Sequence, residues 1–169
     1  MWKNNARAYT SLLQRTIQET RIEIHLKDMK DKFTYIDLGL PSGRLWASEN
    51  AEGYFTYDDA KEKFGDLLPK PEAFKELWRE CRWLWDVKNK GMIVVGPNKN
   101  TIFLLAWGYG GAEGGFNNRC SYGYYCSSEM RKGKYTSYPI VLEFNAEAVW
   151  PMSDFHYECG YSVRLCKEQ

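Results

Sequence analysis

The spacing of apolar residues changes near Gly91, and this change decides which folds the chain can form. Before it, residues 56–85 carry apolar side chains mostly at helical spacing, whereas after it short apolar runs are separated by glycine-rich turns. Helices early in a chain and short strands late in it are typical of an α+β architecture. The sequence therefore predicts one α+β domain with short antiparallel strands, two helices and long loops, preceded by an N-terminal helix.

The first 32 residues carry two patterns of their own. Residues 3–20 are predicted to be helical because four apolar residues recur near helical spacing, namely Tyr9, Leu12, Leu13 and Ile17. The next three apolar residues alternate with polar ones and predict a strand; they are Ile22, Ile24 and Leu26. Residues 1–32 are thus expected to form a helix and strand extension of a domain at 33–169. The helix has two open roles: packing on that domain, or joining subunits into a homo-oligomer.

Turn and cap residues predict the elements of the first half. Strands at 35–38 and 44–47 flank a tight turn at Pro41-Ser42-Gly43. One helix is expected to begin at the capping residue Thr56 and to break at Gly65. A second is expected after Pro71, extending through "WRECRWLW". Its buried face is predicted to carry Phe74, Leu77, Trp78 and Cys81.

The second half is expected to be strands and loops. Two apolar strands surround the turn Gly96-Pro97-Asn98, and later strands are predicted at 138–144 and 160–165. Residues 112–128 are predicted to be a long glycine-rich loop. The overlapping "GYGGAEGG" segment at 108–115 lacks both the Gly-Lys-Ser/Thr ending and the following helix of a phosphate-binding loop.

Composition excludes several classes of function. The net charge of +1 gives no electrostatic basis for binding nucleic acid or an anionic membrane. No apolar run approaches the roughly 18–20 residues that span a bilayer. The first 21 residues lack the apolar core and cleavage site of a signal peptide, so Sec-type export is not expected.

No residue is predicted to be catalytic or to bind a metal or cofactor. The five cysteines are odd in number and form no CxxC pair, so reduced thiols are expected; they are Cys81, Cys120, Cys126, Cys159 and Cys166. Zinc ligation is not expected at these spacings, and calcium is left open. Asp58 and Asp59 fall in a first helical turn, where acidic side chains suit the helix dipole.

The abundance of aromatic residues favours a binding surface. Aromatic residues make up 16% of the chain, and tyrosine and tryptophan supply rigid contact area at low entropic cost. Many of them fall in three segments predicted to be loops, at 122–125, 130–135 and 150–158. The predicted ligand-contacting residues are Tyr124, Cys126, Glu129, Met130, Tyr135, Trp150, Met152, Asp154, Phe155, His156, Tyr157 and Glu158.

Five phrases in this order carry a family resemblance: "YIDLGLPSGRLWAS", "LPKPEAFKELWRECRWLW", "GMIVVGPNKNTIFLLAWGY", "GYYCSS" and "GYSVRLC". They resemble the Fibrobacter succinogenes major paralogous domain, a family abundant in gut Bacteroidetes and their phages. The resemblance covers about residues 33–166. It implies a C-type-lectin-like fold and a ligand-binding role, similar to the variable receptor-binding proteins that retroelements diversify.

In such variable proteins the diversified positions precede the final strand, which corresponds here to Ser162-Val163-Arg164. Mutation of adenines in Asn codons can produce the residues at 154–157, at Cys159, at Tyr124 and at Cys126, but not Met152, Glu129 or Glu158. Two departures from the family pattern bear on this comparison. Cys126 stands where the family usually has tryptophan, and residues 3–20 replace a common export signal, which favours a cytoplasmic protein or a phage virion protein.

The resulting hypothesis is a non-enzymatic binding module for an unidentified protein or glycan. Replacing Phe155 and Tyr157 by alanine is expected to abolish binding with little change in melting temperature. One alternative is a cysteine oxidase similar to the formylglycine-generating enzyme, which would pair Cys159 with Cys126 or Cys120. Another is a structural virion or assembly protein held by the N-terminal helix.

Overall fold

The computed structural model describes residues 2–111 and 114–168, apart from the side chains of residues 2–10, 22, 25, 26, 29 and 30. It is a mixed α+β structure and divides into two compact units, residues 1–32 and residues 33–169. No helix in the described part of the chain is both long enough and apolar enough to cross a membrane. Residues 112 and 113 of the predicted glycine-rich loop lie outside the described residues.

The first unit is one continuous helix, α1 (Trp2–Lys32). The strand predicted from the alternation of Ile22, Ile24 and Leu26 is therefore wrong, since all three residues lie in the helix. Three alternating residues cover barely more than one helical turn, and the first and last of them are also four apart, which is helical spacing. Within the helix, Arg15 Nε and Glu19 Oε1 form an ion pair at 2.9 Å.

The first half of the second unit follows the sequence prediction closely. Strands β1 (Tyr35–Asp37) and β2 (Leu45–Ala47) pair antiparallel across the predicted turn, where Gly43 has φ +73° and its N–H donates to Leu40 O at 2.9 Å. After β3 (Ala51–Phe55), helix α2 (Tyr57–Phe64) begins at the predicted cap. There, Thr56 Oγ1 accepts a hydrogen bond from Asp59 N at 3.3 Å. The helix ends at Gly65, and a single 3₁₀ turn (Gly65–Leu67) follows.

Helix α3 (Pro71–Glu80) is shorter than predicted and exposes one predicted core residue. Phe74 and Leu77 are fully buried, but Trp78 is 52% exposed, so its assignment to the buried face is wrong. The helix ends at Cys81, and residues 82–86, predicted to be helical, form strand β4 (Arg82–Asp86). Strands β5 (Gly91–Val95) and β6 (Thr101–Leu105) complete an antiparallel meander with β4 and confirm the predicted hairpin.

The remaining strands correct the loop predictions for residues 108–158. Strands β7 (Tyr109–Gly110) and β8 (Phe116–Asn117) form a small hairpin. Three longer strands follow as an antiparallel set: β9 (Gly123–Lys132), β10 (Ser137–Phe144) and β11 (Val149–Asp154). The segments 122–125, 130–135 and 150–158 are thus largely strands whose glycine, serine and charged residues resemble those of loops in sequence.

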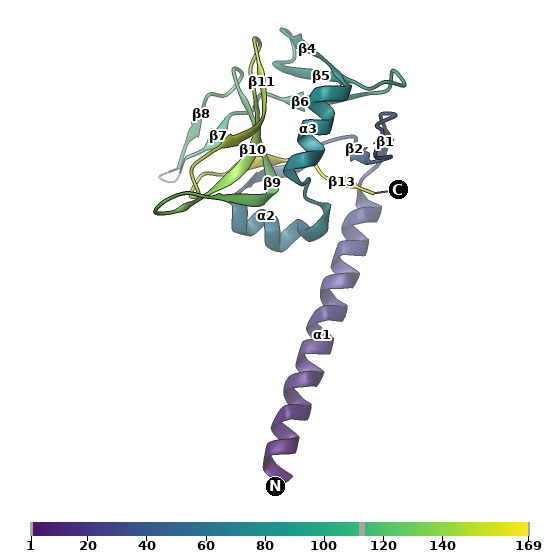
Figure 1. Ribbon diagram of the computed structural model, residues 1–169, viewed down its shortest axis with the longest axis vertical. Coiled ribbons are helices and arrows are strands. Elements are labelled where there is room, and N and C mark those ends of the chain that lie inside the picture. Colours follow the sequence, from purple (N-terminus) through teal and green to yellow (C-terminus); the bar gives the residue numbers. More distant parts are fainter. Residues whose placement is uncertain (1, 112–113, 169) are drawn as a thin grey trace. The chain divides into compact units, whose positions relative to one another are not determined.

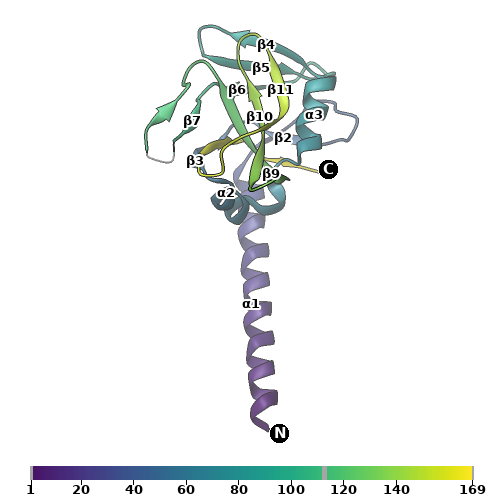
Figure 2. The same cartoon turned by 60° about the vertical axis from the view of Figure 1, so that its left-hand side comes forward.

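The last strands complete two sheets. Strand β12 (Tyr161–Val163) lies between β9 and β3 in the five-stranded sheet β11-β10-β9-β12-β3, parallel to β9 and antiparallel to β3. Strand β13 (Cys166–Lys167) pairs with β2 in the three-stranded sheet β1-β2-β13. Figures 1 and 2 show the β9–β10–β11 strands between α3 on one side and the β7–β8 hairpin on the other.

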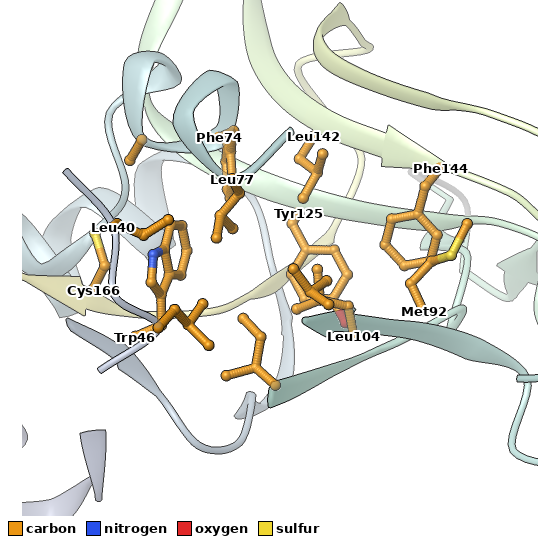
Figure 3. Packing of buried hydrophobic residues seen from close by; sticks show 14 of the residues in the cluster. Leu40, Trp46, Phe74, Leu77, Met92, Leu104, Tyr125, Leu142, Phe144 and Cys166 are labelled. Atoms are coloured by element: carbon orange, nitrogen blue, oxygen red, sulfur yellow. The ribbon is translucent and has the colours of Figure 1, made fainter. Parts of the chain in front are cut away.

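The core lies between α3, the five-stranded sheet and the β4–β5–β6 meander. Tyr125, Leu142 and Phe144 point from the sheet into this core, where Trp46 and Phe74 stack with ring centroids 5.8 Å apart (Figure 3). Because side chains alternate along a strand, Tyr124 and Cys126 lie on the opposite face of the sheet. That opposite face leads to the candidate site.

Candidate functional site

A shallow groove lies where the predicted contact segment 150–158 meets the residues that directly follow the predicted segment 130–135. Its volume is about 370 Å³, and it is lined by Thr136, Ser137 and Tyr138 on one side and by His156, Tyr157 and Glu158 on the other. Thr136 directly precedes β10, Ser137 and Tyr138 are the first two residues of that strand, and the last three residues follow β11. We call this the 136–158 groove. Segments 20 residues apart in sequence thus form one polar and aromatic surface.

Backbone hydrogen bonds hold both walls of the groove. Gly133 N donates to Thr136 O at 2.8 Å and closes the turn before β10, while Phe155 N donates to Pro139 O at 3.2 Å. An ion pair at 2.9 Å joins Arg131 Nη1 to Asp154 Oδ2 across the two sides. The groove is therefore attached to the sheet at the start of each wall.

Phe155 packs beneath the side of the groove that residues 156–158 form, on the protein-interior side. Its ring packs on Tyr124, Tyr109 and Tyr161, with centroid distances of 4.7, 4.9 and 6.0 Å. Burial raises the pKa of Tyr124 to about 12, although the hydrogen bond from Asn118 opposes that shift. The half-buried Phe155 thus fixes the position from which the next three side chains extend outward.

The far end of the same wall is also held. Gly160 and Gly110 exchange two backbone hydrogen bonds of 2.9 Å, and Cys159 N donates to His156 O at 3.2 Å. The Tyr161 hydroxyl donates to the same His156 carbonyl. Residues 156–158 therefore form a short exposed segment between two fixed points.

Tyr157 links the groove to helix α2. Its hydroxyl donates to Asp58 Oδ2, in the first turn of that helix. This hydrogen bond to a carboxylate, which stabilises the protonated phenol, raises the pKa of Tyr157. Asp58 thus orients a tyrosine that remains 42% exposed on the groove wall.

The predicted contact residues divide by exposure. Seven are exposed: Glu129, Tyr135, Trp150, Asp154, His156, Tyr157 and Glu158. Met130, Met152 and Phe155 are half-buried. Tyr124 and Cys126 are only 3% and 0% exposed, so predicting them as contact residues is wrong. Both were assigned to a loop, but they lie in the central strand β9 and their side chains pack inside the protein.

A second aromatic surface was missed in the sequence. Tyr54 lies between Trp107 and Phe116, with centroid distances of 6.2 and 4.9 Å, and the Arg119 guanidinium lies 4.8 Å from the Phe116 ring centroid. Trp107 is 36% exposed and Phe116 is 54% exposed. We call these four residues the Trp107 patch. The abundance of aromatic residues was the one sequence signal for this patch, because its members come from three segments that are distant in sequence.

The Trp107 patch and the 136–158 groove are neighbours through Gly160. A Cβ atom added at Gly160 would lie 3.1 Å from Tyr54 Cβ, which shows how closely the two chain segments approach. The groove wall that begins at Phe155 therefore ends against the patch. Trp, Tyr and Arg are the residue types that dominate binding energy at protein interfaces.

Among the described residues, the cysteine and acidic side chains form no cluster that could hold a metal ion. All five cysteines are free thiols. Burial raises the pKa of Cys126 to about 12 and also raises that of Cys159, so both thiols favour the protonated form at neutral pH. Among the described residues, no three His, Cys, Asp or Glu side chains gather as a metal site requires.

Comparison with known proteins adds no relative: no family model, curated protein or solved structure matches this sequence. The class of protein defined by the structure is therefore a mixed α+β protein with an exposed groove beside an aromatic patch.

Proposed function

We propose that the chain is a ligand-binding protein with a C-type-lectin-like scaffold, and that it contacts its ligand through the 136–158 groove. The observation that carries the proposal is the meeting of residues 156–158, from one predicted contact segment, with residues 136–138, which directly follow another, in one open groove. The ligand is a protein or a glycan. Histidine, glutamate and tyrosine there supply both hydrogen-bonding groups and apolar contact area.

The proposal includes diversification of the groove by a retroelement. Three of the residues reachable by adenine mutation, namely Asp154, His156 and Tyr157, are exposed on or beside the groove. Phe155 and Cys159 are also reachable, but they are less exposed and their replacement would alter packing. A neighbouring reverse transcriptase gene, with a template repeat differing only at adenines, would support this part of the proposal. Without such a repeat, the groove would be a static binding site.

The binding proposal can be tested on arrays of glycans and of cell-surface proteins probed with the full chain. The double variant His156→Ala/Glu158→Ala is expected to lose about tenfold or more in affinity for any ligand found, because two polar contacts disappear. Its melting temperature should stay close to that of the parent, since both side chains are exposed. A ligand that binds the variant as tightly as the parent would place the site elsewhere.

Two further variants make the test sharper. Val87→Ala removes a 69% exposed side chain from the β4–β5 turn and serves as the matched control, with no expected loss of binding. Phe155→Ala is expected to lower stability by about 2 kcal/mol, since the ring fills an aromatic cluster. The sequence alone instead predicts Phe155 as an exposed contact residue, whose replacement would change stability little.

Two alternatives have less support. An oxidase of the formylglycine-generating type needs a reactive cysteine pair, and burial disfavours the thiolate at both Cys126 and Cys159. Rapid, selective labelling of one of these thiols at neutral pH would revive that alternative. A structural role in a virion or assembly would rest on α1 and not on the groove.

A further inference from the structure

Arg119 places an unneutralised positive charge on the Trp107 patch. Its side chain is exposed, and no acidic side chain in the described part of the chain forms an ion pair with it. Its guanidinium lies 4.8 Å from the Phe116 ring centroid. Burial raises the pKa of Tyr54, and the charge of Arg119 opposes that shift, so its field reaches this ring as well. The patch therefore combines one cation with three aromatic rings.

The backbone holds this cation in place. Arg119 lies between Asn118 and Cys120, whose φ values are +57° and +65°, a left-handed conformation that is uncommon outside glycine. Cys120 N donates a hydrogen bond of 2.7 Å to Ala106 O, next to Trp107 in the chain. The segment that carries Arg119 is thus fixed to the segment that carries Trp107. A ligand that binds here does not have to order the backbone of the patch, which favours affinity.

A second pair of an aromatic ring and a cation lies beside the opposite wall of the 136–158 groove. Lys134 Nζ lies 5.0 Å from the Tyr135 ring centroid, and Tyr135 is 88% exposed. Both residues directly precede Thr136, which lines the groove. Among the described residues, no acidic side chain forms an ion pair with Lys134. The groove therefore has such a pair beside each wall.

Most acidic side chains around the groove already have partners. Asp154 forms its ion pair with Arg131, and Asp58 accepts the hydrogen bond from Tyr157. Glu158 lines the groove and, within the described residues, forms no ion pair. The two flanking cations thus outnumber the unpaired acid of the groove lining. Charge complementarity favours a ligand with carboxylates on both sides of its central contact.

The chemistry of the patch matches a polypeptide better than a glycan. The Tyr54 hydroxyl donates to Trp107 O, so the donors left on the four side chains are the Trp107 indole N–H and the Arg119 guanidinium. A sugar ring carries several hydroxyls, which would lose water on the aromatic rings without gaining partners. An apolar side chain beside an aspartate or glutamate can instead pack on the rings while its neighbour accepts charge-assisted hydrogen bonds from Arg119.

We propose that the ligand of the 136–158 groove is a protein segment with acidic residues on both sides of its central contact. Arg119 on the Trp107 patch binds one carboxylate, and Lys134 beside Tyr135 binds the other. Apolar side chains next to these carboxylates pack on the aromatic rings. This inference rests on the proposed function and narrows its ligand to an acidic polypeptide.

The test uses random linear peptides displayed on phage and selected on the full chain. Enriched sequences should carry Asp or Glu next to apolar or aromatic residues. In titrations of an enriched peptide, Arg119→Gln should weaken binding about tenfold or more, because its charge-assisted hydrogen bonds to the carboxylate are lost. Lys134→Gln should weaken binding as well. Arg82→Gln is the matched control, since it removes the same charge from an exposed position in β4, and it should leave the affinity nearly unchanged.

The outcomes separate this inference from the proposed function. A selection that enriches no peptide, or peptides without acidic residues, would overturn the inference, as would equal affinities of Arg119→Gln and Arg82→Gln. A ligand of any class, glycans included, that depends on His156 and Glu158 but not on Arg119 would retain the groove and overturn the acidic partner. Acidic peptides that depend on Arg119 but not on His156 and Glu158 would support the charged patch and contradict the groove.

Discussion

Arg164 lies buried near the C-terminal end of the chain, at 2% exposure, and its guanidinium donates to three oxygen atoms. Asn50 Oδ1 accepts from Nε and Ala47 O accepts from Nη1, both at 2.8 Å, and Phe103 O accepts from Nη2. Asn50 in turn donates to the Tyr125 hydroxyl at 3.0 Å. Burial lowers the pKa of Arg164, which shows the cost of holding this cation inside. Arg164 thus connects its own segment to two others, residues 47–50 and Phe103, and Asn50 extends the network to Tyr125.

Arg164→Met should therefore destabilise the protein strongly. The substitution keeps much of the side-chain volume but leaves three buried acceptors without a donor, which we expect to cost about 3–5 kcal/mol. Urea unfolding followed by tryptophan fluorescence measures the change. Arg82→Met, at an exposed position in β4, is the control and should change stability by less than about 0.5 kcal/mol. Equal unfolding midpoints for the two variants would contradict this role of Arg164.

At the scale of elements, turn and cap residues made the most reliable predictions. Pro41 and Gly43, the Thr56 cap and the Gly96-Pro97-Asn98 turn each act through local backbone chemistry, which a single sequence reveals. Strands β9 and β11 were missed because their pairing partners are distant in sequence and their composition is polar and aromatic. Strand β4 was missed because its apolar residues continue the apolar run of α3 without a glycine or proline between them.

The candidate site was predictable only in part, because much of it depends on contacts between residues that are distant in sequence. The exposed residues 156–158 were found because they fall in an irregular stretch directly before Gly160 and the predicted final strand, where local composition is informative. The burial of Tyr124 and Cys126 depends on β10 and β12, which pair with β9 on either side. The sequence around these two residues carries no signal of that pairing. The Trp107 patch brings together β3, the turn after β6 and β8, so its assembly depends entirely on tertiary structure.

Gly108 connects β6 to the β7–β8 hairpin. A substitution at this position measures how strongly the hairpin depends on one backbone conformation. Its φ is +68°, and a Cβ atom there would lie 1.8 Å from Asn117 O. We expect Gly108→Ala to cost about 2–4 kcal/mol, because the hairpin must shift to avoid the clash. Thermal unfolding followed by circular dichroism would measure this change.

Gly114 provides the matched comparison within the same hairpin. It has φ +86° but no atom within 4 Å of an added Cβ, so Gly114→Ala should cost only about 1 kcal/mol from backbone strain. A similar loss of stability in both variants would mean that the backbone near Gly108 can shift at little cost to avoid the added Cβ atom.

At the scale of the whole molecule, buried thiol and phenol groups make the stability of the fold depend on pH under alkaline conditions. Burial raises the pKa of Cys126 and Cys166 from 9.0 to about 12, and that of Tyr35 from 10.0 to about 12. The unfolded chain releases these protons at lower pH than the folded chain does. Stability should therefore be constant with respect to these groups below about pH 9 and should fall as the pH rises from 9 towards 12.

Urea unfolding at pH 8 and at pH 10.5 would measure this effect. The free energy of unfolding should be lower at the higher pH, and Cys126→Ala should lose less between the two conditions than the unaltered chain, because one linked proton is absent. Cys120→Ala, at an exposed position, is the control and should show the full dependence. A steeper loss in Cys126→Ala than in the control would contradict the assignment.

The position of β12 between β9 and β3 has a consequence for biosynthesis. Strands β9 and β3 are synthesised before β12 and must wait for it, and β2 must likewise wait for β13. Until then the nascent chain presents unpaired strand edges on β9 and β3, which are the features that recruit chaperones or pair wrongly with other chains. A chain truncated before Tyr161 would thus leave both of these sheets incomplete.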